Sequence, residues 1–371
     1  MSQTAPLRYH PEVEQISADE EAVHRELAQT FESIITKTHD DLGHAERGVH
    51  AKSHALLVGE VVVHENLPPE LAQGIFAESK RRYPALVRIS SIPGDPLRDS
   101  VSLPRGFSLK VIGVDGARLP GSEQDTSQDF LAATAPAFSA PDSKAFLKNL
   151  KLLVRTTDKA EGAKAALSAV LRTVEKGLEA VGVESAKLKS LGGYPKTHPL
   201  GERYYTQVAL RHGDYIAKLD IVPESENFRR LIGQEIDFEG RENALREEIA
   251  RMLSEEGGSW TLRVQLCRDL ESNPVEDASK VWPEDDNPYL PVASVIVAPQ
   301  QSWSDARSRL LDDQTSFRPW HGTEAHRPLG NVMRARRYVY PISVDLRSKL
   351  NGCPMHEPRS LPSVDGRDRG E

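Results

Sequence analysis

Residues 104–111 read Pro-Arg-Gly-Phe-Ser-Leu-Lys-Val, and their large apolar side chains, at 107, 109 and 111, alternate with polar or small ones. A period of two is typical of a β-strand that buries one face. Residues 54–64 form a second β-rich run, with four valines around a glycine, and residues 260–266 alternate again. These runs predict several half-buried strands.

A hairpin and several helices accompany these strands. Residues 205–221 contain two alternating runs joined by His212-Gly213-Asp214, a sequence that favours a turn. The strand–helix–strand rhythm of a parallel sheet is not evident, so the pattern predicts an α+β fold with an antiparallel sheet or barrel. Helical spacing marks residues 18–39, residues 143–191 with a break near Asp158, residues 239–256 and residues 333–350.

The bulk composition narrows the function classes. Of 371 residues, 38% are hydrophobic and 27% are charged, as in an ordinary globular protein. The net charge of −8 and the lack of a basic stripe argue against a nucleic-acid partner. Cys267 and Cys353 lie far apart, which excludes a disulfide framework and suits a reducing cytoplasm. Because no apolar run has the length of a membrane span, we expect a cytoplasmic protein that does not cross a membrane.

Four short segments carry more specific information. They are residues 47–52 (Arg-Gly-Val-His-Ala-Lys), residues 87–91 (Val-Arg-Ile-Ser-Ser) leading to residues 104–110, residues 280–283 (Lys-Val-Trp-Pro) and residues 336–341 (Arg-Arg-Tyr-Val-Tyr-Pro), which continue to Arg347. In this order and at these separations they resemble the catalase superfamily. The resemblance covers roughly residues 45–347, and the motifs are specific in combination rather than singly.

The resemblance implies a catalase-like antiparallel β-barrel with surrounding helices and a buried haem b. It implies that the Tyr340 phenolate is the iron ligand and that His50 lies above the iron on the other face. On a helix, Arg336 lies one turn before Tyr340, where its positive charge favours the ionised form of the phenol. An imidazole with a near-neutral pKa can take a proton from a peroxide and return it to the departing oxygen.

The resemblance also implies contacts with the rest of the haem. Arg47, Arg88 and Arg347 would bind the two propionates, because a guanidinium forms bidentate, charge-assisted hydrogen bonds to a carboxylate. Phe138 and Phe146 fall where the family has phenylalanines near the haem, and Phe146 would lie on or beside the ring. Ordinary core packing is the alternative for the phenylalanines.

The chain departs from the family's pattern at several points. Ala133 stands where the family has an asparagine that helps to position peroxide, and Val344 stands where many catalases have a histidine after the tyrosine. By the same resemblance, we expect neither the C-terminal helical domain nor the long N-terminal arm of full-length catalases. We expect a single domain over residues 1–371, with its core at about 45–350 and a loose tail at 351–371, similar to the minimal-core catalase-related haem proteins.

The expected function is a haem-dependent peroxidase that reduces hydrogen peroxide or organic hydroperoxides, fatty-acid hydroperoxides among them, with an organic electron donor. The alternatives within the family are an enzyme that rearranges fatty-acid hydroperoxides and a weak true catalase. A non-catalytic haem carrier or sensor is the rival from another class, but a carrier does not need the proton shuttle that the Arg47/His50 pair supplies. The expected partners are a peroxide and a small organic or lipid molecule, and the assembly stays open, with a homodimer as one candidate.

A metal site made of histidines is a further interpretation. His44, His50 and His54 are close in sequence, and the last two are four residues apart. No carboxylate or cysteine completes a convincing ligand set around them, so the haem hypothesis is preferred.

Overall fold

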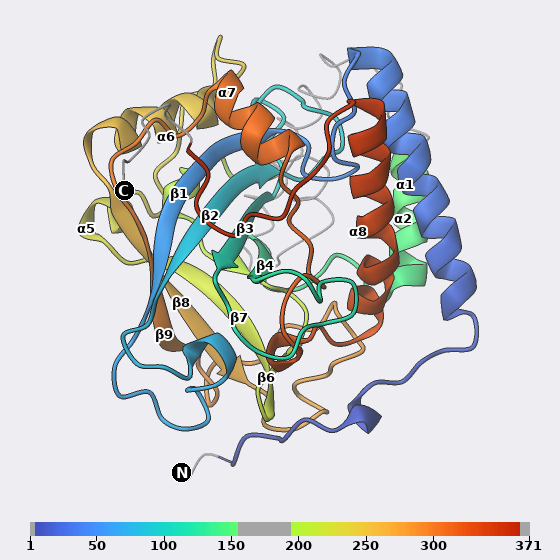
Figure 1. The fold of residues 1–371 in the computed structure, drawn as a ribbon, viewed down its shortest axis with the longest axis vertical. Helices are drawn as coiled ribbons and strands as arrows, with labels where there is room; N and C mark the ends of the chain where they lie inside the picture. The colour runs from blue at the N-terminus through green and yellow to red at the C-terminus, as the bar shows by residue number, and fades with distance from the viewer. Residues whose placement is uncertain (1–3, 155–193, 364–371) are drawn as a thin grey trace, which may run out of the picture.

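The computed structural model describes residues 4–154 and 194–363, and within them one antiparallel sheet of nine strands dominates the molecule (Figure 1). The strand order is β5-β4-β3-β2-β1-β9-β8-β7-β6, and β5 also pairs with β7. Eight strands therefore close into a barrel, while β6 pairs with β7 outside the ring. The strands are β1 (Ser53–Val63), β2 (Arg82–Ser91), β3 (Arg105–Ile112), β4 (Ser127–Ala133), β5 (Tyr204–Tyr205), β6 (Leu210–His212), β7 (Tyr215–Pro223), β8 (Gly258–Leu266) and β9 (Leu290–Val297).

The barrel follows from the alternation in its strands. Phe107, Leu109 and Val111 of β3 belong to the large apolar cluster that fills the barrel, and each is fully buried. The alternate residues of β2 and β3 face outward. Many of these are buried as well, because helices and loops cover this side of the barrel; Arg88 is 2% exposed and Lys110 is inaccessible. A buried layer of polar and charged side chains therefore lies between the barrel and the segments that cover it.

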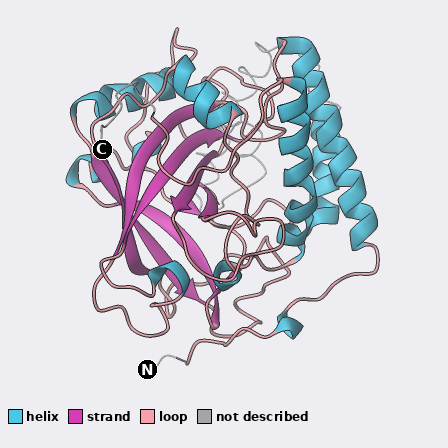
Figure 2. Ribbon diagram, in the orientation of Figure 1, coloured by secondary structure: helices cyan, strands magenta, loops and turns pink. Residues whose placement is uncertain are grey.

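Three helices stand side by side along one flank of the barrel (Figures 1 and 2). They are α1 (Glu20–Leu42), α2 (Ser143–Val154) and α8 (Asn331–Leu350), and α8 continues through Pro341. Leu27, Leu147 and Val339, one from each helix, belong to the apolar cluster that joins them. The other helical elements are η1 (Pro11–Val13), η2 (Gly74–Phe76), η3 (Pro199–Gly201), α5 (Glu226–Arg229), α6 (Ala244–Glu255), α7 (Asp305–Ser308), η4 (Arg309–Asp313) and η5 (Glu324–His326).

Most of the predicted elements are present, with shifted ends. The helix predicted over residues 239–256 begins at Ala244, and the predicted hairpin has a first arm, β6, of only three residues. Strands β4 and β9 were not predicted. Strand β4 begins with the polar residues Ser-Gln-Asp, which are buried. Their burial is possible because Asp129 and Gln128 form an ion pair and hydrogen bonds with other segments, and the sequence does not reveal these partners. The predicted helix beyond Val154, including its break near Asp158, lies outside the described residues.

As far as Arg359, the segment after α8 is bonded to the rest of the protein, unlike the loose tail expected at residues 351–371. Glu357 bonds to the ammonium group of Lys110 and accepts a hydrogen bond from Ser127 Oγ at 2.5 Å. Arg359 donates to a backbone carbonyl of the loop before β4 at 2.9 Å. The physical reason is that Lys110 is buried within the protein and needs anionic partners, which Asp129 (2.7 Å) and Glu357 provide.

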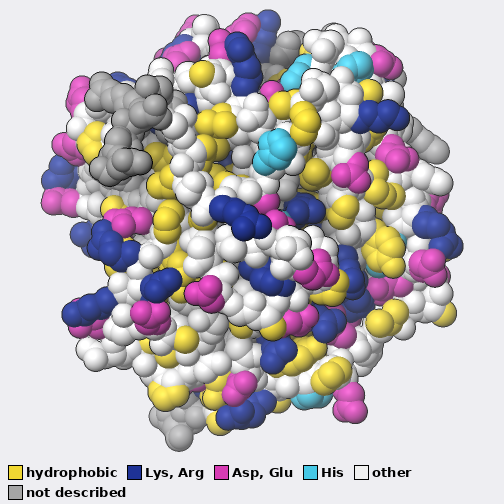
Figure 3. Space-filling view, viewed as in Figure 1, with side chains coloured by type: hydrophobic (Ala, Val, Ile, Leu, Met, Phe, Trp, Pro, Cys, Tyr) yellow, Lys and Arg dark blue, Asp and Glu magenta, His cyan; other side chains and the backbone are white. Residues whose placement is uncertain are grey.

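Positive and negative side chains are interspersed on the face seen in Figure 3, without a basic stripe. Among the helices of the described ranges, not one is both long enough and apolar enough to cross a bilayer.

Several buried histidines make the stability of the fold depend on pH. Burial lowers the pKa of His198 and His212 to about 4, and the pKa values of His54 and His326 lie well below 6.5. Below a pH of about 6.5 the unfolded chain binds protons that the folded protein does not bind until a much lower pH. Protonation therefore favours the unfolded state, and stability falls as the pH falls.

We predict that the free energy of unfolding decreases between pH 7 and pH 5.5, by on the order of 1 kcal/mol for each of these histidines in the first pH unit below 6.5. Urea denaturation at several pH values measures the free energy of unfolding. His212→Gln, which keeps a donor for the Leu71 carbonyl, should weaken the pH dependence by about one proton. An unfolding free energy that stays constant over this range would contradict the prediction.

Candidate functional site

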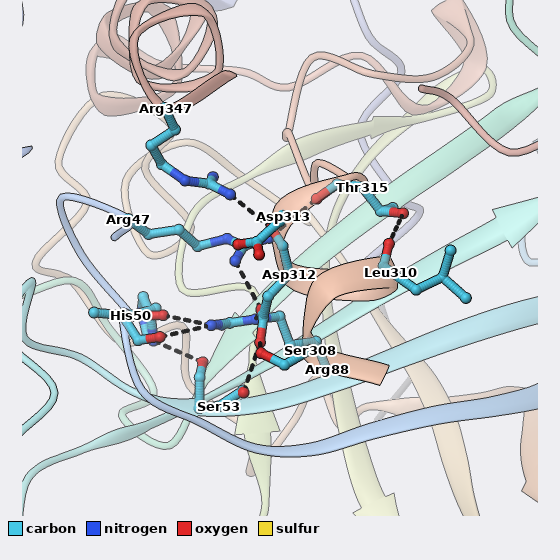
Figure 4. Close-up of polar contacts among 12 residues, drawn as sticks. Arg47, His50, Ser53, Arg88, Ser308, Leu310, Asp312, Asp313, Thr315 and Arg347 are labelled. Atoms are coloured by element: carbon cyan, nitrogen blue, oxygen red, sulfur yellow. Dashed lines mark hydrogen bonds and ion pairs between the residues drawn. The ribbon is translucent and has the colours of Figure 1, made fainter. Parts of the chain in front are cut away.

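Three arginines predicted to bind haem converge on one residue, Asp312 (Figure 4). Arg47 Nη1 and Arg88 Nε donate to Asp312 Oδ1 at 2.7 and 2.5 Å. Arg347 Nη2 donates to the backbone carbonyl of Asp312 at 2.6 Å. The arginines come from the loop before β1, from β2 and from α8, while Asp312 belongs to η4, a short π-helix. Four segments far apart in the sequence therefore meet at this aspartate.

The cluster is buried and has more positive than negative charge. Arg88, Arg347 and Asp312 are 2%, 3% and 6% exposed. Burial, then the charges of Arg88 and Arg347, hold the pKa of Arg47 well below its ordinary value. Burial alone would raise the pKa of Asp312, but the charges of Arg88 and Arg47 outweigh burial and keep that pKa well below the usual carboxyl value. Asp312 is therefore ionised at neutral pH, and the guanidiniums repel one another around it.

His50 lies beside this cluster, in the loop that leads to β1. Its backbone is left-handed, with φ of 56°. Its N–H donates to the carbonyl of Ile92 at 2.6 Å, and its own carbonyl accepts from Arg88 Nη2 at 2.7 Å. Burial, followed by the charges of Arg88, Arg336 and Arg47, lowers the pKa of His50 to about 3. The imidazole is therefore neutral at neutral pH, and its pKa lies below the near-neutral value expected from the sequence.

Residues of β2 and β3 lie against the imidazole. A Cβ atom on Gly106 would lie 2.6 Å from two atoms of the His50 ring, so the contact requires glycine. Ser90 Oγ lies 3.2 Å from His50 Nδ1. Ala133 is the register partner of Gly106, and paired residues of adjacent strands point to the same side of a sheet. The methyl group of Ala133 therefore faces the side of the sheet on which His50 lies.

Helix α8 carries Arg336 and Tyr340, which are four residues apart and so share one face. Tyr340 is partly buried. The guanidinium of Arg336 lies 5.4 Å from the centroid of the Phe138 ring, and that ring lies 5.0 Å from the ring of Phe146. Val49, next to His50, packs against the apolar cluster that contains Ala335 and Val339 of α8, so α8 and the His50 loop border the same region.

The sequence reasoning missed the partners of the arginines. Ser53 Oγ donates to Asp312 Oδ2 at 2.6 Å, and Arg47 Nη2 donates to the carbonyl of Thr315 at 3.1 Å. Three buried arginines require a negatively charged counter-ion, and this requirement is the one sign in the sequence that an acidic residue lies among them. It does not indicate which of the 55 acidic residues meets it.

The three histidines of the alternative metal site do not form a ligand group. His44 bonds to Asp313 at 3.0 Å, and His54 bonds to the hydroxyl of Ser91 at 2.7 Å. Residues 4–154 and 194–363 contain no group of three or more histidine, cysteine, aspartate or glutamate side chains that could hold a metal ion. The haem hypothesis involves a different donor, the phenol of Tyr340.

Comparisons with known proteins point to one family. The chain is 24% identical over 344 residues to a catalase of Neisseria gonorrhoeae, a match that covers 87% of this chain and 63% of the relative. It is 21% identical over 322 residues to a peroxisomal catalase of Toxoplasma gondii, covering 84% of this chain and 60% of the relative. This similarity over most of the chain supports a place in the catalase superfamily. No family model matches the chain.

Solved catalases share the fold. A fungal catalase matches with a TM-score of 0.59 and 17% identity, covering 99% of this chain and 73% of that one. Catalase A from Saccharomyces cerevisiae matches with a TM-score of 0.58 and 16% identity, covering 98% and 74%. The chain spans 63% and 60% of the length of the two curated catalases described above. The closed antiparallel barrel with flanking helices is thus the catalase fold, as predicted.

The residues present fit the haem that the superfamily implies. A phenol on α8, a neutral imidazole in the loop before β1 and three guanidiniums that bond to Asp312 are a donor set suited to the iron and the two propionates of haem b. In addition, Arg347 Nε is buried and makes no hydrogen bond with any described residue. Other arginines of the described residues, such as Arg105, also have a buried Nε without a hydrogen bond, so this atom alone does not distinguish a propionate site.

Proposed function

We propose that this member of the catalase superfamily is a haem-dependent peroxidase. One observation carries the proposal. The neutral imidazole of His50 lies beside the arginine cluster, and the charge of Arg336 on α8 acts on it. A proton acceptor, cations for the propionates and the helix with Tyr340 thus border one region. When bound there, the haem would supply the redox chemistry that cleaves the O–O bond of a peroxide.

Each residue of the site has a separate task in this proposal. Tyr340 would hold the iron through its phenolate, and Arg336 lies one turn before it on the same face of α8. His50 would take a proton from the peroxide and return it to the departing oxygen. The low pKa of His50 keeps it in the accepting form at neutral pH, and the contacts with Ser90 and Gly106 keep its ring oriented.

Ala133 favours a peroxidase over a true catalase. Its methyl group faces the His50 side of the sheet, where the family's pattern has an asparagine that donates a hydrogen bond to peroxide. Without that donor a second hydrogen peroxide is poorly oriented as the reductant, and an organic donor takes its place. The same methyl group favours a second candidate, rearrangement of a fatty-acid hydroperoxide, because it leaves this side less polar and roomier for a bulky substrate.

The remaining expectations are part of the proposal. The substrates would be hydrogen peroxide or an organic hydroperoxide together with a small organic or lipid molecule. We propose a cytoplasmic location, with which the free thiols Cys267 and Cys353 agree. A homodimer remains a prediction that size-exclusion chromatography with light scattering would test.

Haem binding should depend on Tyr340, and the reaction with peroxide should depend on His50. We predict that Tyr340→Phe loses most of its haem, because the proposed anionic ligand is gone. Tyr338→Phe, on the same helix at a side chain that is 49% exposed, is the matched control and should keep its haem. His50→Ala should bind haem but react with peroxide ~10²–10⁴-fold more slowly, since it lacks the proton acceptor.

Visible spectra of the purified variants and stopped-flow mixing with peroxide measure these effects. A Tyr340→Phe protein with an unchanged spectrum would refute the axial ligand. A His50→Ala protein that reacts as fast as the wild type would refute the proton shuttle.

The ratio of oxygen evolved to donor oxidised tests the role of Ala133. We predict that the wild type evolves little oxygen from hydrogen peroxide relative to its oxidation of a dye. Ala133→Asn should raise that ratio, on the order of tenfold or more, because one preorganised donor is commonly worth ~10²-fold in rate. An oxygen electrode and a dye assay at matched haem content provide the two rates. A wild type that disproportionates hydrogen peroxide as fast as an ordinary catalase would overturn the peroxidase assignment.

A further inference from the structure

The arginine cluster contains an internal anion that the proposed function does not yet explain. If Arg47, Arg88 and Arg347 only had to bind the two propionates, no protein carboxylate would be needed among them. Yet Asp312 Oδ1 accepts from both Arg47 and Arg88, at 2.7 and 2.5 Å. The presence of a carboxylate that binds two of the three guanidiniums therefore requires a separate explanation.

The charge of the cluster supplies that reason. Three guanidiniums and one carboxylate leave a net charge of two positive units, which equals the charge of two ionised propionates. Glu46 is half-buried nearby, and its pKa is raised by burial and then by the charge of Asp312. Without Asp312, the cluster would contain three buried positive charges, which repel strongly where water is excluded.

We propose that Asp312 is the positioning residue of the propionate site. It acts as a fixed counter-ion that holds Arg47 and Arg88 in place before haem binds and leaves the site with the charge that matches two carboxylates. This inference rests on the proposed function, because it assigns the arginines to a haem.

The surroundings of Asp312 fix it in this position. Ser53 Oγ donates to Asp312 Oδ2 at 2.6 Å and also accepts a hydrogen bond from Trp303 Nε1 at 3.0 Å. Leu311, the preceding residue, is 1% exposed and belongs to an apolar cluster on the outer face of the barrel. The carboxylate is therefore held by its own hydrogen bonds and by the packing of η4.

The neighbouring residue offers a matched control. Asp313 is also acidic, but its carboxylate bonds to His44, at 3.0 Å. Asp313→Asn thus removes one negative charge from the same turn without removing the carboxylate shared by Arg47 and Arg88. Asp312→Asn removes that carboxylate, and its amide N–H₂ group is a donor that a guanidinium cannot satisfy.

The experiment compares thermal unfolding of the full chain with and without haemin, for the wild type, Asp312→Asn and Asp313→Asn. Haem-free Asp312→Asn should melt roughly 5–10 °C below the haem-free wild type, because unpaired buried charges remain. Haemin should raise its melting temperature more than it raises that of the wild type, since the propionates replace the missing anion. Asp313→Asn should gain as much from haemin as the wild type does.

A second variant keeps the test decisive if Asp312→Asn does not fold without haem. Asp312→Asn combined with Arg47→Gln restores the net charge of the cluster, so it should fold and melt above Asp312→Asn alone. A double variant no more stable than the single one would overturn the proposal.

The haemin results separate this inference from the proposed function. An equal gain in the wild type and Asp312→Asn would overturn the positioning role alone. A wild type that gains nothing from haemin would overturn the haem assignment and the positioning role with it.

Discussion

The site depends on one constraint, the sharing of the Asp312 carboxylate by Arg47 and Arg88. This contact ties the loop before β1 to the outer face of β2 and to η4, and the bond from Arg347 to the Asp312 carbonyl adds α8. His50 is positioned by the same arrangement, because Arg88 donates to its carbonyl. The orientation of the proposed proton acceptor thus depends on an ion pair that does not include it.

Such a cluster is costly to the folded state. Burying guanidiniums removes them from water, and the attraction of one carboxylate repays only part of that cost. A pair of apolar residues would stabilise the same layer at least as well. The barrel interior, with Phe107, Leu109 and Val111, already supplies apolar burial on the other face of the strands. We therefore interpret the buried charges as a functional feature, retained for a dianionic ligand rather than for stability.

The sequence predicted those features that depend on local pattern. The strand at Phe107, the hairpin at residues 212–214 and helix α8 follow from periodicity and turn residues, and the structure contains all three. Strand β4 could not be predicted, because the burial of its Asp129 depends on Lys110 across the sheet. Asp312 was missed for the same kind of reason, since its partners are 224 and 265 residues away in sequence. The sequence pattern of one helix or strand shows which of its residues are buried together. It does not show which charged residues of distant segments form ion pairs.

The most direct test of the central claim is a crystal structure of the protein loaded with haem b. We predict one haem between the barrel and α8, with iron bound by the Tyr340 oxygen, His50 on the opposite face and the propionates against Arg47, Arg88 and Arg347. We also predict that Asp312 keeps its bonds to Arg47 and Arg88 when the propionates are in place. A haem bound elsewhere, or one whose iron is held by a residue other than Tyr340, would contradict the account.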